Sequence, residues 1–332
     1  MLYTQFLRPY LFRWDAEDAH EFALRSARRL ARSRWLCGLI RAAVRPKPSP
    51  VRALGLTFPN PVGLAAGMDK NALAPLAWWA FGFGFVELGT VTPLPQGGSD
   101  KPRMFRHPEL AAVVNRMGFN NDGAATVAAR LAEQAKAGLR PPFPIGVSVG
   151  KNKDTPDERT VDDYQTAAAA LAPHADFVAI NVSSPNTDKL RELQTGPWMS
   201  RLVTAVRAAS GAKPVLVKVA PELVGDGLNE VLDAVLTAGA AGVIATNTLA
   251  TGGKNGFEVG GLSGRPLRDI SPRNVEAIRR RVGDGVTVIG VGGIEDAATA
   301  RRMLDAGATL VQLYTALVYQ GPFLPVTISR GL

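Results

Sequence analysis

Eight short apolar runs recur along the 332 residues of this chain, and longer stretches with helical spacing separate them. The runs are PVGLAAG (61–67), FGFVELGTV (83–91), PIGVSVG (144–150), DFVAINV (176–182), PVLVKVA (214–220), GVIATNT (242–248), VTVIGVGG (286–293) and TLVQLYTA (309–316). Continuous apolar runs of this length indicate strands that are buried on both faces, as in a parallel sheet. Eight such strands alternating with helices over about 280 residues predict an α/β fold, a (β/α)₈ TIM barrel.

The stretches between the runs agree with this prediction. Two sets of residues have helical spacing. The first is Leu228, Val231, Leu232, Val235 and Leu236, and the second is Ala300, Met303 and Leu304, which come after a candidate cap at Glu295-Asp296. A doubly wound sheet is the alternative fold. It is disfavoured because the first run lacks the Gly-x-Gly-x-x-Gly fingerprint with an acidic residue about 20 positions later. Two long gaps, 92–143 and 249–285, are rich in Gly and Pro and predict inserted loops.

Residues 1–45 differ in composition from the rest of the chain. They contain nine arginines, no lysine and four acidic residues, a net +5 of the formal +9. In EFALRSARRLARSRWLCGLI (21–40) the arginines alternate with apolar residues, which predicts short amphipathic helices. These helices fit either a membrane interface, where apolar burial and attraction to anionic lipid add, or a cap packed on the protein. The prolines of VRPKPSPVR (44–52) predict a linker, so we expect a helical extension, 1–45, and a barrel domain, 46–332.

The composition narrows the classes of protein and site. With 46% hydrophobic residues the chain can build a large core, and its single cysteine, Cys37, excludes an internal disulfide. The histidines, His20, His107 and His174, are too scattered to predict a metal site. No run reaches about 18 apolar residues, so we expect neither a membrane span nor a signal peptide. A basic surface can meet nucleic acid, but no stacking platform or recognition motif is visible, so we expect no nucleic acid partner.

Polar residues follow the runs at their carboxyl ends, where barrels build their active sites. They are Ala66-Gly67-Met68-Asp69-Lys70, Gly89-Thr90, Ser148 with Lys151-Asn152, Asn181 to Asn186, Lys218, Thr246-Asn247-Thr248, Gly292-Gly293 and Tyr314-Thr315. Any one of them alone is most simply a cap for the next helix. Lys218 differs, because a charge inside VLVKVA needs a partner or an anionic ligand. Gly292-Gly293 followed by Tyr314-Thr315 predicts a site for a phosphorylated ligand.

The segment Ser183-Ser184-Pro185-Asn186 directly follows the fourth run and raises the question whether either hydroxyl is catalytic. Pro185 holds Ser184 extended, and Asn186 tolerates turn geometry. On these residues alone, a structural turn is the simpler interpretation.

Eleven motifs occur in order between residues 65 and 322: AAGMDKN, ELGTVTP, KPRMFR, NRMGFNN, VGKNKDT, AINVSSPNT, VKVAPEL, IATNT, GGLSGRPL, IGVGGI and LVQLYTALVYQGP. Together they closely resemble the membrane-associated, quinone-dependent class (class 2) of dihydroorotate dehydrogenases. The N-terminal DAEDAHEF resembles the extension that distinguishes this class from the soluble one. The resemblance covers nearly the whole chain.

The resemblance implies one bound FMN and a set of site residues. The implied FMN contacts are Ala66, Gly67, Met68, Asp69, Lys70, Thr90, Ser148, Asn181, Lys218, Thr246, Gly264, Gly293, Tyr314 and Thr315, with the phosphate at the last three. The implied contacts of dihydroorotate or orotate are Lys70, Asn115, Arg116, Met117, Gly118, Phe119, Asn181, Asn186, Asn247 and Thr248. Ser148 departs from the pattern, since relatives usually place an asparagine there, and its contact with the flavin is shorter or water-mediated.

The resemblance also implies the reaction, in the biosynthesis of pyrimidines. The base that removes the C5 proton of dihydroorotate is a serine in this class and a cysteine in the soluble class, and the matching residue is Ser184. A hydride leaves C6 for the flavin, which a membrane quinone reoxidises. His20 and Arg106 are implied to border the quinone passage, although a solvated histidine and a surface ion pair are simpler interpretations. We expect a peripheral protein at the anionic, cytoplasmic face of a bacterial-type cell membrane.

Two other enzymes are alternatives. A soluble-class enzyme that uses fumarate or a nicotinamide is disfavoured by Ser184 and by the extension. A phosphosugar-type barrel would share the phosphate site but would carry no flavin, so its solution would be colourless.

Overall fold

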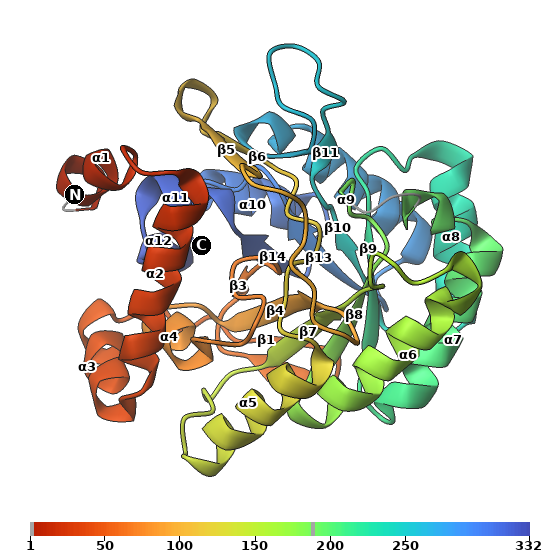
Figure 1. The fold of residues 1–332 in the computed structure, drawn as a ribbon, viewed down its shortest axis with the longest axis horizontal. Helices are drawn as coiled ribbons and strands as arrows, with labels where there is room; N and C mark the ends of the chain where they lie inside the picture. Colours follow the sequence, from red (N-terminus) through yellow and green to blue (C-terminus); the bar gives the residue numbers. More distant parts are fainter. Residues whose placement is uncertain (1–2, 187–189) are drawn as a thin grey trace.

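A computed structural model describes residues 3–186 and 190–332, and its central element is a closed barrel of eight parallel strands (Figure 1). The strands are β3 (Val62–Leu64), β4 (Phe85–Val91), β7 (Ile145–Val149), β8 (Phe177–Asn181), β9 (Val215–Val219), β10 (Gly242–Ala245), β13 (Thr287–Val291) and β14 (Leu310–Leu313). They follow one another around the barrel in chain order, and β14 pairs with β3 to close it. Each lies within one of the eight apolar runs, so the predicted barrel is confirmed.

Helices connect the strands and cover the outside of the barrel (Figure 1). They are α4 (Pro75–Ala80), α5 (Ala124–Lys136), α6 (Thr160–Leu171), α7 (Gly196–Ser210), α8 (Gly225–Thr237), α9 (Ile270–Val282), α10 (Ala297–Asp305), α11 (Thr315–Gln320) and α12 (Leu324–Gly331), with short 3₁₀ turns at Pro108–Leu110, Asp157–Arg159, Ala172–His174, Leu190–Leu193 and Arg265–Leu267. The two helices predicted from spacing, α8 and α10, are confirmed. The cap of α10 is Asp296, whose carboxylate accepts a hydrogen bond from Thr299 N at 2.8 Å.

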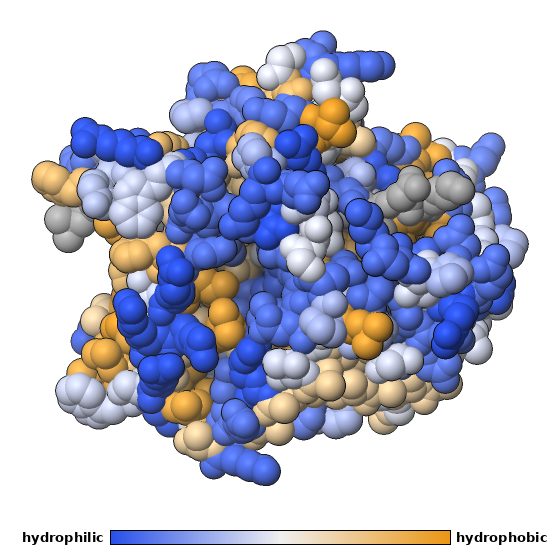
Figure 2. Space-filling view, viewed as in Figure 1, coloured by the Kyte–Doolittle hydropathy of each residue, from blue (hydrophilic) through white to orange (hydrophobic). Residues whose placement is uncertain are grey.

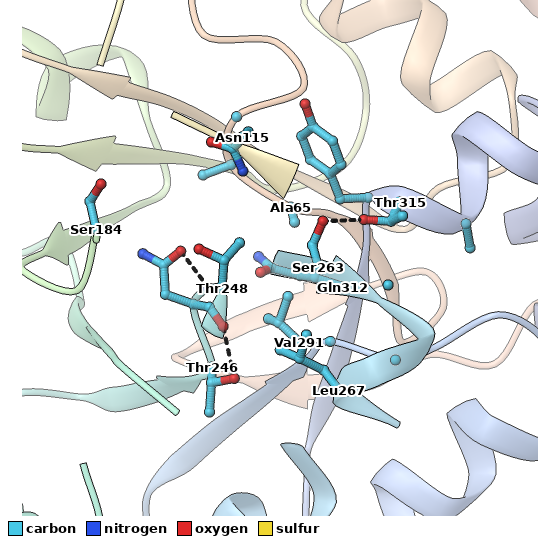
Figure 3. Close-up of a pocket in the computed structure, with 18 of the residues that line it drawn as sticks. Ala65, Asn115, Ser184, Thr246, Thr248, Ser263, Leu267, Val291, Gln312 and Thr315 are labelled. Carbon is cyan, nitrogen blue, oxygen red and sulfur yellow. Dashed lines mark hydrogen bonds between the residues drawn. The ribbon is translucent and has the colours of Figure 1, made fainter. Parts of the chain in front are cut away.

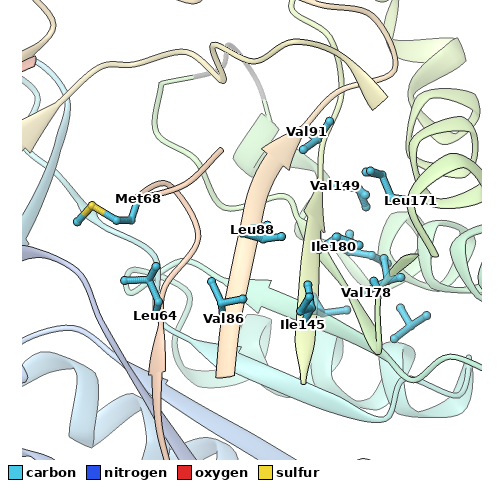
Figure 4. Packing of buried hydrophobic residues seen from close by; sticks show 14 of the residues in the cluster. Leu64, Met68, Val86, Leu88, Val91, Ile145, Val149, Leu171, Val178 and Ile180 are labelled. Carbon is cyan, nitrogen blue, oxygen red and sulfur yellow. The ribbon is translucent and has the colours of Figure 1, made fainter. Parts of the chain in front are cut away.

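The strands bury both faces, which explains why their sequences are continuously apolar. On the inside, Phe85, Phe177 and Leu216 belong to one cluster; on the outside, Val86 and Leu88 pack toward the helices (Figure 4). A hairpin of β1 (Val51–Ala53) and β2 (Leu56–Phe58) brings Phe58 against the inner cluster, with its ring centroid 5.2 Å from that of Phe85. The hairpin therefore closes the amino end of the barrel and leaves the carboxyl end open for a site.

The two long gaps hold short strands in addition to the predicted loops. They contribute β5 (Met104–His107), β6 (Ala112–Asn115), β11 (Leu249–Ala250) and β12 (Gly261–Gly264), which form a four-stranded antiparallel sheet. Strand β12 pairs with β6, so Gly261 lies opposite Asn115 although 146 residues separate them. Strands of two to four residues are too short to show a periodic pattern, and their partners are remote in sequence.

The N-terminal residues form a helical extension, as predicted. It consists of a π-helical turn, η1 (Tyr3–Leu7), followed by α1 (Arg8–Leu11), α2 (Ala16–Ala31) and α3 (Arg34–Val44). Asp15 caps α2 and Ser33 caps α3, each through its side-chain oxygen. Helix α2 packs against α4 and β5, and α3 packs against α4. Within the described residues, no helix is both long and apolar enough to cross a membrane.

Candidate active site

A large pocket opens at the carboxyl ends of the barrel strands (Figure 3), with about 1210 Å³ of empty volume including the solvent at its mouth. Most of the predicted site residues line it: Ala66, Gly67, Lys70, Thr90, Asn115, Met117, Gly118, Phe119, Asn181, Ser184, Asn186, Lys218, Thr246, Asn247, Thr248, Gly264, Gly293, Tyr314 and Thr315. They come from the ends of the barrel strands and from the four-stranded sheet. The fold therefore gathers residues that are up to about 250 positions apart, as barrels do at this end.

Four of the residues predicted to contact FMN or dihydroorotate do not line the pocket. Met68 packs in the hydrophobic core, and Arg116 turns outward, where its Nη2 donates to the carbonyl of Pro102 at 2.9 Å. Asp69 is fully buried, and its carboxylate accepts hydrogen bonds from two backbone N–H groups and from Trp78 Nε1 at 3.0 Å. Burial raises the pKa of Asp69. Its geometry is that of a residue that holds the loop before α4.

Ser148, the fourth, lies behind the pocket wall. Its Oγ is 3.0 Å from Thr90 Oγ1, and Thr90 also accepts from Asn181 Nδ2 at 2.7 Å. Asn247 Nδ2 in turn donates to Asn181 Oδ1 at 3.2 Å and to Ser183 Oγ at 3.0 Å. This chain of hydrogen bonds fixes the orientation of both amide groups at the pocket wall. Ser148 thus supports the pocket through Thr90 rather than by lining it.

Ser184 lies at the pocket with its side chain mostly buried, 6% exposed. Pro185 and Asn186 form the turn that the sequence predicts; the next residue of the motif, Thr187, lies outside the described residues. Ser184 Oγ accepts a hydrogen bond from Asn186 N at 3.2 Å, and Asn186 Nδ2 donates to Asn115 Oδ1 at 3.2 Å. Within the described residues, the bond from Asn186 N is the only hydrogen bond of the Ser184 hydroxyl, so the hydroxyl proton remains available for a ligand or water.

Two lysines place positive charge at the pocket. Lys218 is 5% exposed, and it makes no hydrogen bond or ion pair with any residue that the structure describes. A lysine that is mostly buried and has no protein partner is costly, so a pocket lined by Lys218 suits a ligand that accepts a hydrogen bond from its ammonium. Burial, assisted by the charge of Arg103, lowers the pKa of Lys70 to about 8. When no ligand is bound, the pKa of Lys70 is therefore close to neutral pH.

The glycines at the end of β13 shape the opposite side of the pocket. Gly292 and Gly293 both have positive φ, 109° and 72°. A Cβ on Gly293 would lie 2.4 Å from the backbone nitrogen of Arg268, so only glycine fits there. Thr315 Oγ1 donates to Ser263 Oγ at 2.8 Å. Burial raises the pKa of Tyr314 to about 12, which keeps its hydroxyl protonated. Small residues and hydroxyls at this end suit an anionic group.

His20 and Arg106 lie outside this pocket, at the junction of the extension with the barrel. Burial, together with the charge of Lys70, lowers the pKa of His20 to about 3, so its imidazole is neutral. Arg106 donates to the carbonyls of Leu11 (3.1 Å) and Trp14, and its guanidinium lies 4.6 Å from the ring centroid of Phe12. Arg106 thus holds the turn between α1 and α2 and forms no ion pair with any residue that the structure describes.

The pocket also contains residues that lie inside the quoted motifs but were not assigned a ligand contact, among them Ser263, Leu267, Val291, Gln312 and Tyr319. Gln312 had a detectable signal, because it is a polar residue inside the apolar run TLVQLYTA, as Lys218 is inside VLVKVA. The others are apolar, or lie in segments without a periodic pattern, and carry no such signal.

The model of the dihydroorotate dehydrogenase family matches residues 50–332. The chain belongs to the dihydroorotate dehydrogenase family. Among its relatives, dihydroorotate dehydrogenase (quinone) of Salinispora arenicola is 51% identical over 338 residues, covering 98% of this chain and 97% of the relative. The enzyme of the same name from Chloroflexus aurantiacus (strain J-10-fl) is 46% identical over 353 residues, covering 100% and 96%.

Solved structures agree with this membership. A dihydroorotate dehydrogenase from Eimeria tenella in complex with ferulenol superimposes with a TM-score of 0.83 at 34% identity, over 96% of this chain and 90% of that chain. The ligand-free form of the Eimeria tenella enzyme gives a TM-score of 0.81 at 35% identity, over 88% and 93%. The match to the ferulenol complex covers nearly all of this chain.

Proposed function

We propose that this chain oxidises dihydroorotate to orotate, with FMN as the redox cofactor and a membrane quinone as the electron acceptor, in the biosynthesis of pyrimidines. The observation that carries the proposal is Lys218, a buried lysine that has no hydrogen-bond or ion-pair partner among the described residues and lines a pocket together with Ser184 and many amide and hydroxyl side chains. Two relatives that match over nearly the whole chain bear the name of this quinone-dependent enzyme.

The residues present fit FMN. Gly293, Tyr314 and Thr315 would hold its phosphate, and Thr90, Asn181, Thr246 and Lys218 would hold its ring system, with Ala66, Gly67 and Gly264 in backbone contact. When bound, FMN supplies an acceptor for the hydride from C6 of dihydroorotate. Lys218 contributes positive charge at the pocket, which favours the negatively charged, reduced state of a ligand beside it.

Ser184 is assigned the removal of the C5 proton. Ser184 lines the pocket, and a serine that acts as a base needs a water or hydrogen-bond chain to carry the proton away from Oγ. Asn115, Asn186, Asn247 and Thr248 would orient the amide edges of the substrate, and Lys70 would pair with its carboxylate. Met117, Gly118 and Phe119 would enclose the substrate on the side of the four-stranded sheet.

The extension is assigned membrane attachment and access for the quinone. Its outer face exposes apolar side chains: Phe6 (70%), Tyr10 (54%), Trp35 (74%), Leu36 (41%) and Leu39 (48%). Figure 2 shows apolar side chains on either side of hydrophilic ones over α2 and α3. Apolar burial and nine arginines in residues 1–45 together suit an anionic bilayer surface. His20 and Arg106, at the junction of extension and barrel, would border the path of the quinone.

Anaerobic mixing with dihydroorotate tests the proposal. The purified protein is expected to be yellow, to release FMN on heating, and to bleach when dihydroorotate is added, with orotate absorbing at about 290 nm as the conjugated product. Addition of a short-chain quinone is then expected to restore the yellow colour. A colourless protein, release of FAD, or a flavin that dihydroorotate fails to bleach would overturn the proposal. Restoration by fumarate or a nicotinamide in place of quinone would assign the soluble type of reaction.

A further inference from the structure

Gln312 and Glu87 form a polar pair inside the barrel, at the floor of the pocket. Gln312 lies on β14 and Glu87 on β4, the two strands that flank β3, and the residues are 1% and 0% exposed. Gln312 Nε2 donates to Glu87 Oε2 at 2.6 Å. The family motifs assign no role to either residue, and the proposed function does not use them.

This pair leaves two acceptor atoms without a partner. Neither Gln312 Oε1 nor Glu87 Oε1 accepts a hydrogen bond from any residue that the structure describes. A carboxylate accepts and does not donate, so the NH₂ group of Gln312 must face Glu87 and its carbonyl oxygen must face elsewhere. A buried acceptor without a donor is strongly unfavourable, and such an atom in a native structure calls for a ligand or a function.

The position of Gln312 points to the ligand. Its side chain lines the pocket, whereas Glu87 lies beneath it. Figure 3 shows Gln312 among the residues that line the pocket. Lys218 projects from β9, three strands away around the barrel. A flavin with its phosphate near the end of β14 and its ring edge at Lys218 must therefore cross the floor where Gln312 lies.

We propose that Gln312 contacts the bound flavin: its carboxamide oxygen accepts a hydrogen bond from a donor of the cofactor, and Glu87 is the positioning residue that turns that oxygen toward the pocket. The inference rests on the proposed function, because it requires a flavin. Oxidised FMN offers two kinds of donor, the hydroxyls of its ribityl chain and the N3–H of its ring. Both present the same chemistry to a carbonyl oxygen, so the experiment must separate them.

Release of FMN from the full-length holoenzyme measures this contact. After dilution, the free flavin is followed by its fluorescence. Replacing both members of the pair (Gln312→Met with Glu87→Met) removes the acceptor without leaving a buried carboxylate, and we expect release about tenfold faster, the worth of one hydrogen bond. Glu87→Gln keeps an oxygen that can accept from Gln312 Nε2, so release should change less than about twofold. Leu216→Met, a swap inside the barrel, reports any general loosening of the core.

Flavin analogues separate a ligand contact from a structural role. The wild-type and doubly substituted proteins are loaded by exchange with 2′-deoxy-FMN or with N3-methyl-FMN. The analogue that lacks the donor bound by Gln312 should leave both proteins at the same rate, whereas FMN should leave the doubly substituted protein faster. Equal release of FMN from the two proteins, or the same acceleration in Leu216→Met, overturns the inference. It is also overturned if both analogues, like FMN, leave the doubly substituted protein faster.

The two proposals fail in different ways. A wild-type protein that holds no FMN, or whose flavin dihydroorotate does not bleach, refutes the proposed function itself. A loaded wild type that bleaches normally, combined with variants that retain FMN as firmly as it does, refutes only the contact of Gln312.

Discussion

The pocket and the outer face of the extension depart from the usual burial pattern in opposite directions. At the carboxyl end of the barrel, Asn181, Lys218 and Gln312 are polar and almost completely buried. On the extension, Trp35 and Phe6 are apolar and more than two-thirds exposed, at 74% and 70%. Both arrangements are unfavourable for an isolated chain in water, and each becomes favourable when a second component is present. The comparison indicates a small polar ligand in the barrel and an apolar surface against the extension.

The two regions are joined by a buried ion pair. Glu17 of α2 accepts three hydrogen bonds, at 2.7, 3.0 and 3.2 Å, from Arg103, and these side chains are only 4% and 8% exposed. Arg103 Nη1 also donates to the carbonyls of Gly97 (2.6 Å) and Ser99 (2.8 Å), and Ser99 N donates to Met117 O at 3.1 Å. Glu17 is thus linked to a pocket-lining segment. Deleting residues 1–45 would leave Arg103 buried without this partner, so point substitutions separate the regions better.

The largest expected effect falls on the barrel. Ser184→Ala removes the hydroxyl assigned to the C5 proton, so bleaching of the flavin by dihydroorotate should slow roughly 10² to 10⁴-fold, the usual contribution of a positioned base. Stopped-flow absorbance measures the rate, and FMN content and orotate binding should stay normal. Ser184→Cys should recover only part of the rate. Near-normal bleaching in Ser184→Ala would leave this residue with a structural role in the turn.

Breaking the buried ion pair should have the next largest effect. Glu17→Ala leaves Arg103 as a buried charge without its carboxylate, and the free energy of unfolding should fall by about 3 to 5 kcal/mol in denaturant titrations. The matched control is Glu21→Gln, one turn further along α2, where the exposed ion pairs with Arg25 and Lys101 are each 3.7 Å long. That change should cost less than about 1 kcal/mol. Equal losses in the two variants would show that the pair does not join the regions.

The pair also connects the regions electrostatically, through Lys70. Burial lowers the pKa of Lys70 to about 8, while the charge of Glu17 acts to raise it. Orotate binding requires the protonated amine in our proposal, so affinity is complete below this pKa and is lost as the pH rises through it. We expect about tenfold weaker binding at pH 9 than at pH 7, measured by flavin spectral shifts. Glu17→Gln should move the loss to lower pH, and Lys70→Met should abolish the pH dependence.

The sequence was sufficient for those parts of both regions that have a regular pattern. The eight apolar runs located every barrel strand, and alternating arginines located α2 and α3. Polar residues at strand ends lie together because parallel strands end at one rim, which is a property of the fold. Gln312 and Glu87 were missed because strand residues alternate between two faces, and the apolar runs alone did not show which face points inward.

Contacts between remote segments could not be predicted from the sequence. Nothing near Glu17 indicates Arg103, which lies 86 residues further along the chain. The four-stranded sheet was missed for the same reason, since β6 and β12 pair across two insertions that are remote in sequence. Arg116 is the opposite case: its motif implies a substrate contact, whereas its side chain donates a hydrogen bond to the carbonyl of Pro102 outside the pocket.

The smallest expected effect concerns the outer face of the extension. Trp35→Ser with Leu39→Ser replaces exposed apolar side chains, so the free energy of unfolding and bleaching by dihydroorotate should stay within experimental error. Binding to anionic vesicles, measured by cosedimentation, should weaken about five- to tenfold, together with reduction of a long-chain quinone in those vesicles. Val224→Ser, at an apolar residue of the barrel that is 59% exposed, is the matched control and should change neither property. Unchanged vesicle binding in the double variant would mean that the exposed apolar side chains do not contact the membrane. The extension would then be a structural cap that is held through Glu17.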